Sequence, residues 1–379
     1  MQPHSLDDTL IQAACAQAGQ AMLVCDPNPR VGCVIVDAAG RTLGTGYTQR
    51  VGEAPAEVMA LRAARDAGLD VRSATAYVTL EPCSHFGRTP PCCEALIDAG
   101  LARVVVAQQD PNPRVAGQGI ARLRAAGIAV DVLEPGHPAA LATRELNMGF
   151  FSRMLRQRPW VRLKIAASLD GRTALENGAS QWITSEAARA DGHAWRARAS
   201  AVLTGIGTVL ADDPRLDVRL TESPRQPQLV VLDSRLRTPP EARLFTAGRK
   251  VCIYAALPDA ARQAALEARG ASVVCLPDRK AESEARIDLA AMLSDLGRLE
   301  VNELHVEAGP RLGGALLKAG LVDELLVYLA PKLIGSGRGM ADFEPLKTLT
   351  EALSLEFQST AALGPDLRIV ARISDRGLF

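Results

Sequence analysis

The sequence has few aromatic residues, no net charge and no long apolar run. Aromatic side chains make up 4% of the 379 residues, and 43 basic residues balance 43 acidic ones. A chain without net charge has no general attraction for nucleic acid or for an anionic membrane surface, so neither partner is expected. No apolar run approaches the roughly 20 residues that a membrane-spanning helix needs. The remaining composition, 47% hydrophobic and 23% charged, is typical of globular proteins.

The first eight residues contain neither a basic stretch nor an apolar run. No secretion signal is therefore expected, and the chain is expected in the cytoplasm. The eight cysteines are scattered without the spacing of a disulfide framework. In a reducing compartment such thiols stay reduced or bind a metal.

The length and the hydrophobic pattern indicate two α/β domains, because a single core rarely extends over 379 residues. Residues 1–150 are expected to form the first domain and residues 151–379 the second, with the pattern restarting at Trp160. In the first domain strands are expected at residues 31–36, 43–47, 75–80, 102–107 and 128–133, and helices at 7–22, 56–67, 92–99 and 119–126. In the second, strands are expected at 161–166, 201–203, 229–232, 251–254, 272–275, 303–306 and 324–329, and helices at 186–197, 259–269, 287–296 and 312–319.

A cysteine loop follows the strand expected at residues 75–80. It places Cys83 directly after a proline and Cys92 at the start of a helix, where the backbone N–H groups lower the pKa of a thiol that binds zinc. Glu57, one position inside the preceding helix, is placed to move protons when zinc-activated water attacks an amino-bearing ring carbon. The pattern indicates a zinc deaminase site, and a pair of inert thiols is the alternative.

Four motifs mark the second domain, at residues 163–174, 180–185, 203–214 and 306–315. In the last of them a strand ends in a glycine-rich turn that opens a helix. Free N–H groups at such a helix start, with no side chains in the way, can hold a phosphate. The turn is not the Gly-x-Gly-x-x-Gly dinucleotide fingerprint, and alone it is a weak signal.

Together these motifs resemble the riboflavin-biosynthesis deaminase–reductase family over nearly the whole chain. In the first domain the resemblance rests on residues 26–36, 80–92 and 110–117, and in the second on the four motifs above. It implies an N-terminal cytidine-deaminase-like α/β/α domain and a C-terminal dihydrofolate-reductase-like α/β domain. The implied reaction is the NADPH-dependent reduction of the ribosyl group of 5-amino-6-(5-phosphoribosylamino)uracil to a ribityl chain. The resemblance also implies zinc, a small phosphoribosylated pyrimidine as substrate, and a homodimer or homotetramer.

The resemblance also implies roles for single residues. NADPH contacts are implied for residues at strand ends and in the glycine-rich loop: Ala166, Trp182, Thr208, Asp212, Ser234, Gly309, Pro310, Arg311, Leu312, Gly313, Gly314 and Ala315. Substrate contacts are implied for Lys164, Ser180, Arg196, Leu216, Arg219 and Glu307. Guanidinium groups suit a ribose 5-phosphate because they bind phosphate oxygens in bidentate fashion. Ordinary structural roles are the alternative for Arg196 on a solvated helix face, for Trp182 in a core and for Asp212 in a turn.

One position departs from the family pattern. The family has His-Ala-Glu where this chain has Pro55-Ala56-Glu57, so the third zinc ligand beside Cys83 and Cys92 is absent. Proline fits the first turn of a helix, and the fold is expected to survive. Two thiolates make a poor catalytic site, because three protein ligands plus water is the usual arrangement. We therefore expect deamination to be lost or severely weakened.

Other readings stay open. A substitute ligand, with His85 as the candidate, would restore zinc and give a fully bifunctional deaminase–reductase. In a third interpretation, Pro55 is an engineered or erroneous residue. From a different class, the chain would be a non-catalytic ligand-binding scaffold built on two former enzyme domains, although the complete reductase motifs argue against this.

Overall fold

The computed structural model describes residues 5–84, 91–113, 115–279 and 285–374. The chain divides into two compact units, Met1–Arg156 and Gln157–Phe379. The boundary expected between residues 150 and 151 falls inside helix α6 (Met148–Arg156). Within the described ranges, no helix combines the length and the apolarity that crossing a membrane requires.

The first unit is built on a five-stranded sheet in the order β2-β1-β3-β4-β5. Its strands are β1 (Gly32–Val36), β2 (Thr42–Tyr47), β3 (Thr75–Leu80), β4 (Arg103–Gln108) and β5 (Ala129–Val132). Strand β1 pairs antiparallel with β2 and β3, whereas β3, β4 and β5 are parallel to one another. The parallel half brings the C-terminal ends of β3 and β4 to one edge, where the cysteine loop begins.

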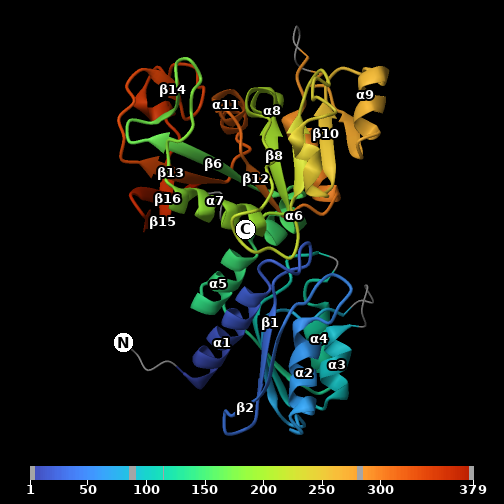
Figure 1. Ribbon diagram of the computed structural model, residues 1–379. Helices are drawn as coiled ribbons and strands as arrows, with labels where there is room; N and C mark the ends of the chain where they lie inside the picture. The colour runs from blue at the N-terminus through green and yellow to red at the C-terminus, as the bar shows by residue number, and fades with distance from the viewer. Residues whose placement is uncertain (1–4, 85–90, 114, 280–284, 375–379) are drawn as a thin grey trace. The chain divides into compact units, whose positions relative to one another are not determined.

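Helices cover both faces of this sheet (Figure 1). They are α1 (Leu6–Gln20), α2 (Ala56–Asp66), α3 (Cys92–Asp98), α4 (Gln118–Ala125) and α5 (Pro138–Leu146), and α6 contacts α5. Figure 1 shows α1 and α5 on one side of the sheet and α2, α3 and α4 on the other. Gly46 in β2 allows α2 to approach closely, because a Cβ atom there would lie 2.3 Å from the Ala56 carbonyl oxygen. This close approach fixes the start of α2, which carries Glu57.

The second unit is built on a nine-stranded sheet in the order β11-β10-β9-β8-β12-β6-β13-β16-β15. Figure 1 shows β6, β12 and β8 in its middle, with β10 toward one edge and β13, β16 and β15 toward the other. The strands of this sheet are β6 (Trp160–Ser168), β8 (Ala201–Gly205), β9 (Gln228–Leu232), β10 (Val251–Ala255), β11 (Ala271–Cys275), β12 (Glu303–Val306), β13 (Glu324–Ala330), β15 (Leu355–Leu363) and β16 (Asp366–Ile373). A separate two-stranded ribbon pairs β7 (Arg172–Leu175) with β14 (Gly337–Gly339).

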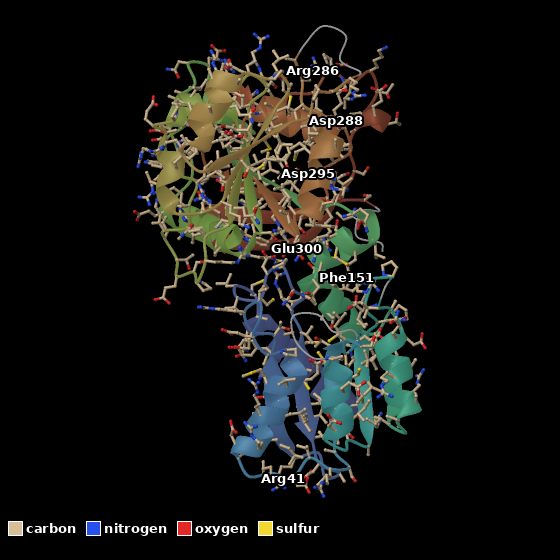
Figure 2. The ribbon with its side chains drawn as sticks, turned by 90° about the vertical axis from the view of Figure 1, so that its right-hand side faces the viewer. Arg41, Phe151, Arg286, Asp288, Asp295 and Glu300 are labelled. Atoms are coloured by element: carbon tan, nitrogen blue, oxygen red, sulfur yellow. The ribbon has the colours of Figure 1, made fainter. Side chains whose placement is uncertain are left out.

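The helices of the second unit pack on opposite faces of the large sheet. They are α7 (Glu186–Arg198), α8 (Ile206–Asp212), α9 (Ala260–Glu267), α10 (Leu289–Arg298) and α11 (Pro310–Lys318), with short 3-10 helices at Arg243–Ala247 and Leu349–Glu351. Helices α10 and α11 share a core with Leu163 and Val306, and α7 packs on Leu326 and Tyr328 of the opposite face. Figure 2 shows Asp295 on α10 and Asp288 directly before its first residue. The Asp288 carboxylate caps this helix by accepting a hydrogen bond from the Ala291 backbone N–H. The Asp295 carboxylate accepts a hydrogen bond from the Tyr254 hydroxyl of β10.

Candidate functional site

A single cavity of about 1740 Å³ in the second unit collects most of the residues expected there. It lies against the C-terminal ends of β6, β8, β9 and β12, where ligands bind in open α/β sheets. The expected residues that line it are Lys164, Ala166, Ser180, Trp182, Arg196, Thr208, Asp212, Leu216, Arg219, Ser234, Glu307, Gly309, Pro310, Arg311, Leu312 and Ala315. Residues from four distant motifs therefore meet in one space.

Gly313 and Gly314 are not among the lining residues. A Cβ atom at Gly314 would lie 2.2 Å from the Asp342 carbonyl oxygen, so the glycine is needed for close packing of α11. Gly313 faces the side chain of Leu163. In the described structure these two glycines serve the helix packing, and a direct cofactor contact from them stays a prediction.

Three charged side chains form the floor of the cavity. Arg196 holds Glu307 in a bidentate pair, with Nε–Oε1 and Nη2–Oε2 distances of 2.7 and 2.9 Å. Burial alone would raise the pKa of Glu307, but Arg196 and Lys164 lower it well below its ordinary value. Burial lowers the pKa of Lys164, while Glu307 acts in the opposite direction. In the described part of the chain no hydrogen bond holds Lys164 Nζ, so this group is available to a ligand, whereas both Glu307 oxygens already accept from Arg196.

Two buried histidines lie near these charges and are neutral near pH 7: His193, which lines the cavity, and His305, which does not. Burial, with Arg196 and Arg219, lowers the pKa of His193 to about 4, and burial lowers that of His305 to about 3. His193 Nδ1 accepts the Arg219 backbone N–H at 3.1 Å. The neutral ring therefore carries its proton on Nε2, which lies 3.5 Å from Arg196 Nη1. His193 thus joins α7 to the loop that carries Arg219.

On the other side of the cavity, two glycines leave the wall without side chains. A Cβ atom added to Gly207 or Gly309 would meet nothing within 4 Å. Gly309 also precedes α11, whose first turn has a proline and no side-chain cap. A helix start of this kind presents N–H groups to a phosphate. These features fit the diphosphate of a dinucleotide, and Thr208, Ser234 and Arg311 add polar groups along the same wall.

Trp182 closes one edge of the cavity as an exposed ring. Its side chain is 62% exposed, so the core role considered from the sequence is wrong. The Arg189 guanidinium lies 4.4 Å from the ring centroid, and Lys332 Nζ donates to the Trp182 carbonyl oxygen at 3.0 Å. Arg196, which is 9% exposed, does not lie on a solvated helix face either. An exposed aromatic ring held in place is suited to contact a flat ligand.

The cysteine loop of the first unit forms a second cluster. Cys83 Sγ and Cys92 Sγ lie 2.9 Å apart, and the Cys92 backbone N–H donates to Cys83 Sγ at 3.2 Å. Glu57 is buried, and desolvation raises its pKa to about 7 despite a hydrogen bond with Cys92. Cys92 has a pKa well above its ordinary value, chiefly because of its hydrogen bond with Cys83 and its burial.

Pro55 stands at the N-cap of α2, where the third ligand would be. Its φ of −72° and ψ of 170° suit proline, and its carbonyl oxygen accepts the Met59 N–H at 3.0 Å. The described residues hold no group of three or more His, Cys, Asp or Glu side chains that could bind a metal ion. His85, the substitute considered from the sequence, lies outside the described residues. The ligand set that the structure describes does not fit a catalytic zinc ion.

The reading of the sequence missed several residues of the cavity: Arg189, His193, Arg215, Arg237, Arg243, Arg286 and Tyr328. His193 had a readable signal, because it lies three residues before Arg196 on a helix and therefore on the same face. Tyr328 lies on the same face of β13 as Leu326 and Glu324, which gives no indication of a ligand contact. The basic residues had no pattern that distinguishes them from surface charges.

Comparisons with known proteins agree in both units. Residues 159–369 match the family described as "RibD C-terminal domain", and residues 4–108 match "Cytidine and deoxycytidylate deaminase zinc-binding region". The chain is 45% identical to the riboflavin biosynthesis protein RibD of Escherichia coli, over 95% of this chain and 98% of the relative. It is 39% identical to RibD of Aquifex aeolicus, over 97% and 98%.

Two solved structures are similar over both units. RibD of Acinetobacter baumannii has a TM-score of 0.87 at 37% identity and covers 98% of this chain and 99% of its own. A diaminohydroxyphosphoribosylaminopyrimidine deaminase/5-amino-6-(5-phosphoribosylamino)uracil reductase from Thermotoga maritima has a TM-score of 0.84 at 29% identity, covering 97% and 99%.

Proposed function

The chain belongs to the RibD family of riboflavin biosynthesis proteins, and we propose that its second unit reduces 5-amino-6-(5-phosphoribosylamino)uracil with NADPH. Family membership gives the chain a cytidine-deaminase-like first domain and a reductase second domain, and it implies NADPH and zinc as cofactors. We propose residues 1–150 for the first domain and residues 151–379 for the second, a boundary that lies inside α6 and before the division of the compact units at Arg156.

The observation that supports this function best is the single cavity that gathers the expected cofactor and substrate residues. Its glycine-lined wall fits NADPH, as tested above on Gly207 and Gly309. In this proposal Trp182, Thr208, Asp212, Ser234 and the loop at 309–315 hold the cofactor. Ser180, Leu216 and the charged floor face the substrate.

The residues of this chain bind and orient the reactants. NADPH, when bound, supplies the hydride that reduces C1′ of the opened ribosyl group. Arg219 and Arg215 hold the 5-phosphate, because guanidinium groups match phosphate oxygens. Arg196 stays bonded to Glu307 and to the Asp217 carbonyl oxygen and adds positive charge at the substrate end of the cavity. Glu307 accepts hydrogen bonds from the ligand's polar groups, and its ion pair with Arg196 and the nearby charge of Lys164 keep it ionised. Lys164 donates hydrogen bonds to the ligand in the same region of the cavity. Positioning of this kind is the main contribution that a protein makes to hydride transfer.

A two-component assay tests the reductase. Purified protein is mixed with NADPH and 5-amino-6-(5-phosphoribosylamino)uracil, and absorbance at the NADPH wavelength is followed. We expect stoichiometric oxidation of NADPH and formation of the ribityl product. Failure of oxidation, with ligand binding retained, would instead favour the non-catalytic scaffold.

For the first unit we propose that deamination is absent or severely weakened. The support is the ligand set at the cysteine loop, in which Cys83 and Cys92 have proline in place of the third ligand. We derive no catalytic step through zinc from these residues. Glu57 keeps the position of the proton shuttle at the start of α2, so restoring the ligand is a direct test.

The Pro55→His variant provides this test. Histidine at the N-cap should restore the third ligand, raise the bound zinc toward one ion per chain, and raise ammonia release from the pyrimidine substrate of the deaminase. NADPH oxidation by the second unit should stay within about twofold of the original rate, since the two sites lie in different units. Pro55→Ala is the matched control, because it removes the proline without adding a ligand. Stoichiometric zinc and deaminase turnover in the unaltered protein would contradict this proposal and favour the fully bifunctional reading.

The homodimeric or homotetrameric state stays a prediction. Size-exclusion chromatography with light scattering of the full chain measures it.

A further inference from the structure

The segment of residues 215–219, called here the 215–219 loop, lies on the cavity wall without belonging to any helix or strand. Arg215, Leu216 and Arg219 all line the cavity. Leu216 has a φ of +52°, in the left-handed region that a leucine rarely adopts. Such a conformation persists only where the surroundings hold it. The question is which groups hold this loop.

Side chains from outside the loop hold its backbone at every residue. Arg249 donates from Nη2 to the Arg215 carbonyl oxygen and from Nη1 to that of Leu216. Arg196 Nη1 donates to the Asp217 carbonyl oxygen. Gln226 pairs with both backbone groups of Val218, accepting its N–H at 2.8 Å and donating to its carbonyl oxygen at 2.9 Å.

At the end of the loop, the Arg219 backbone N–H donates a hydrogen bond to His193 Nδ1 at 3.1 Å. The supporting side chains thus come from α7, from the segment before β9 and from the segment before β10. Helix α7 also carries Arg196, which pairs with Glu307. The loop is therefore held in register with the charged floor of the cavity.

The loop in turn orients two arginines. The carboxylate of Asp217, which is 2% exposed, lies between them. Its Oδ2 is 2.6 Å from Arg215 Nη2, and its Oδ1 is 2.8 Å from Arg219 Nη1. Burial alone would raise the pKa of Asp217, but Arg219 and Arg215 lower it below its ordinary value, so it stays ionised. One buried negative charge between two half-exposed guanidinium groups leaves a net positive charge at the cavity wall. An anionic group such as a phosphate is the ligand that this arrangement attracts.

We propose that Arg249 and Gln226 are positioning residues for the reductase, which fix the 215–219 loop so that its arginines receive the phosphate of the substrate. This proposal rests on the proposed function. Neither residue lines the cavity, so both act through the loop. Arg249 has the larger effect, because its planar guanidinium joins two successive carbonyl oxygens, which the single ammonium of a lysine does not reproduce. Burial lowers the pKa of Arg249 only to about 10, so it remains a charged donor at neutral pH.

The test compares Arg249→Met with the unaltered full-length protein. Displacement of a binding group by about 1 Å can cost on the order of a hundredfold in rate, so we expect KM for 5-amino-6-(5-phosphoribosylamino)uracil to rise roughly tenfold to a hundredfold. The KM for NADPH should stay within about twofold, because the cofactor wall lies elsewhere in the cavity. Calorimetric titration with ribose 5-phosphate should show the same loss of affinity without any turnover. Arg249→Lys should recover part of it.

Gln226→Leu provides a second variant that does not depend on the folding of the first. It should raise the same KM, and the double variant should lose less than the product of the two single effects, because both act on one loop. Arg262→Met is the matched control. Arg262 also donates to a backbone carbonyl oxygen in this unit, that of Arg235, yet it does not support the loop. The kcat and KM values of the Arg262→Met variant should equal those of the unaltered protein.

The outcomes separate the two proposals. If folded Arg249→Met and Gln226→Leu bind ribose 5-phosphate as the unaltered protein does, the positioning role is wrong while the reductase stands. An equal rise in KM for NADPH and for the pyrimidine would also overturn it, since this is the effect of general structural damage. If the unaltered protein neither binds ribose 5-phosphate nor oxidises NADPH with the pyrimidine, the proposed function fails and the positioning role fails with it.

Discussion

Replacing Glu307 by glutamine tests whether the charged floor of the cavity binds ligand or only stabilises the fold. The glutamate accepts two hydrogen bonds from Arg196, with donor–acceptor distances of 2.7 and 2.9 Å. Its side chain is 13% exposed and that of Arg196 is 10% exposed. The amide keeps the shape of the carboxylate but leaves Arg196 and Lys164 without their counter-charge.

Glu303, four residues earlier at the start of β12, provides a matched control. Its carboxylate pairs with Arg162 at 3.0 Å and with Arg198 at 2.8 Å, and its side chain is 1% exposed. Breaking a buried ion pair costs about 3–5 kcal/mol of unfolding free energy. For a unit of this size, such a loss lowers Tm by about 6–20 °C. Both variants should show a loss of this order, because both remove a carboxylate charge that pairs with buried arginines.

Only the Glu307 variant should lose ligand affinity as well. A hydrogen bond to a charged group contributes about 1.5–3 kcal/mol, which corresponds to a rise in Kd of roughly tenfold to 150-fold. Thermal melting and calorimetric titration with ribose 5-phosphate, both at a temperature where each variant is folded, measure the two effects. Equal losses of affinity in Glu303→Gln and Glu307→Gln would refute the assignment of Glu307 as a ligand contact.

Two further predictions concern the cofactor wall and the buried histidines. Trp182→Ala should raise KM for NADPH several-fold with almost no change in Tm, because the residue is 62% exposed and contributes little to the core. Steady-state kinetics with both substrates varied measures this KM. An unchanged KM for NADPH would contradict the prediction. The pKa of His193, lowered to about 4, lies below the value near 6.5 of an unfolded chain, so the unfolded state binds more protons between these values. Unfolding free energy should therefore be fully retained above pH 6.5 and fall as the pH drops toward 4. The unfolding free energy of the His193→Gln variant, measured by urea titration at several pH values, should fall less steeply with pH over this range. The same pH dependence in the variant and the unaltered protein would contradict the assignment.

The sequence pattern predicted the central strands of both sheets because they are buried on both faces. Residues 229–232 are a continuous apolar run and residues 75–80 are apolar except for two threonines, and the structure confirms strands at β3 and within β9. The hairpin of β15 and β16 was not predicted. Most residues of β15 are exposed, so its sequence lacks the alternation that marks a half-buried strand. Helix α8 was also missed, because it has only seven residues, follows Gly205 and contains Gly207, a pattern that indicates a turn.

The site was predicted in part for a similar physical reason. Lys164, Arg196 and Glu307 lie in motifs that are recognisable as a set, and the sheet brings them to one cavity. Arg249 and Gln226 lie on connections whose partners are 8 to 34 residues away, and no local pattern links them to the 215–219 loop. His193 acquires its neutral state from burial and from two arginines that only the fold brings close. Contacts of this kind depend on tertiary packing and leave no periodic signal.

The most direct test of the central claim is one measurement on one preparation of the unaltered protein. Bound zinc, ammonia release from the deaminase substrate and NADPH oxidation with 5-amino-6-(5-phosphoribosylamino)uracil are determined side by side. The predicted result is rapid NADPH oxidation with zinc far below one ion per chain and little or no ammonia. Stoichiometric zinc with sustained ammonia release, or an absence of NADPH oxidation, would contradict it.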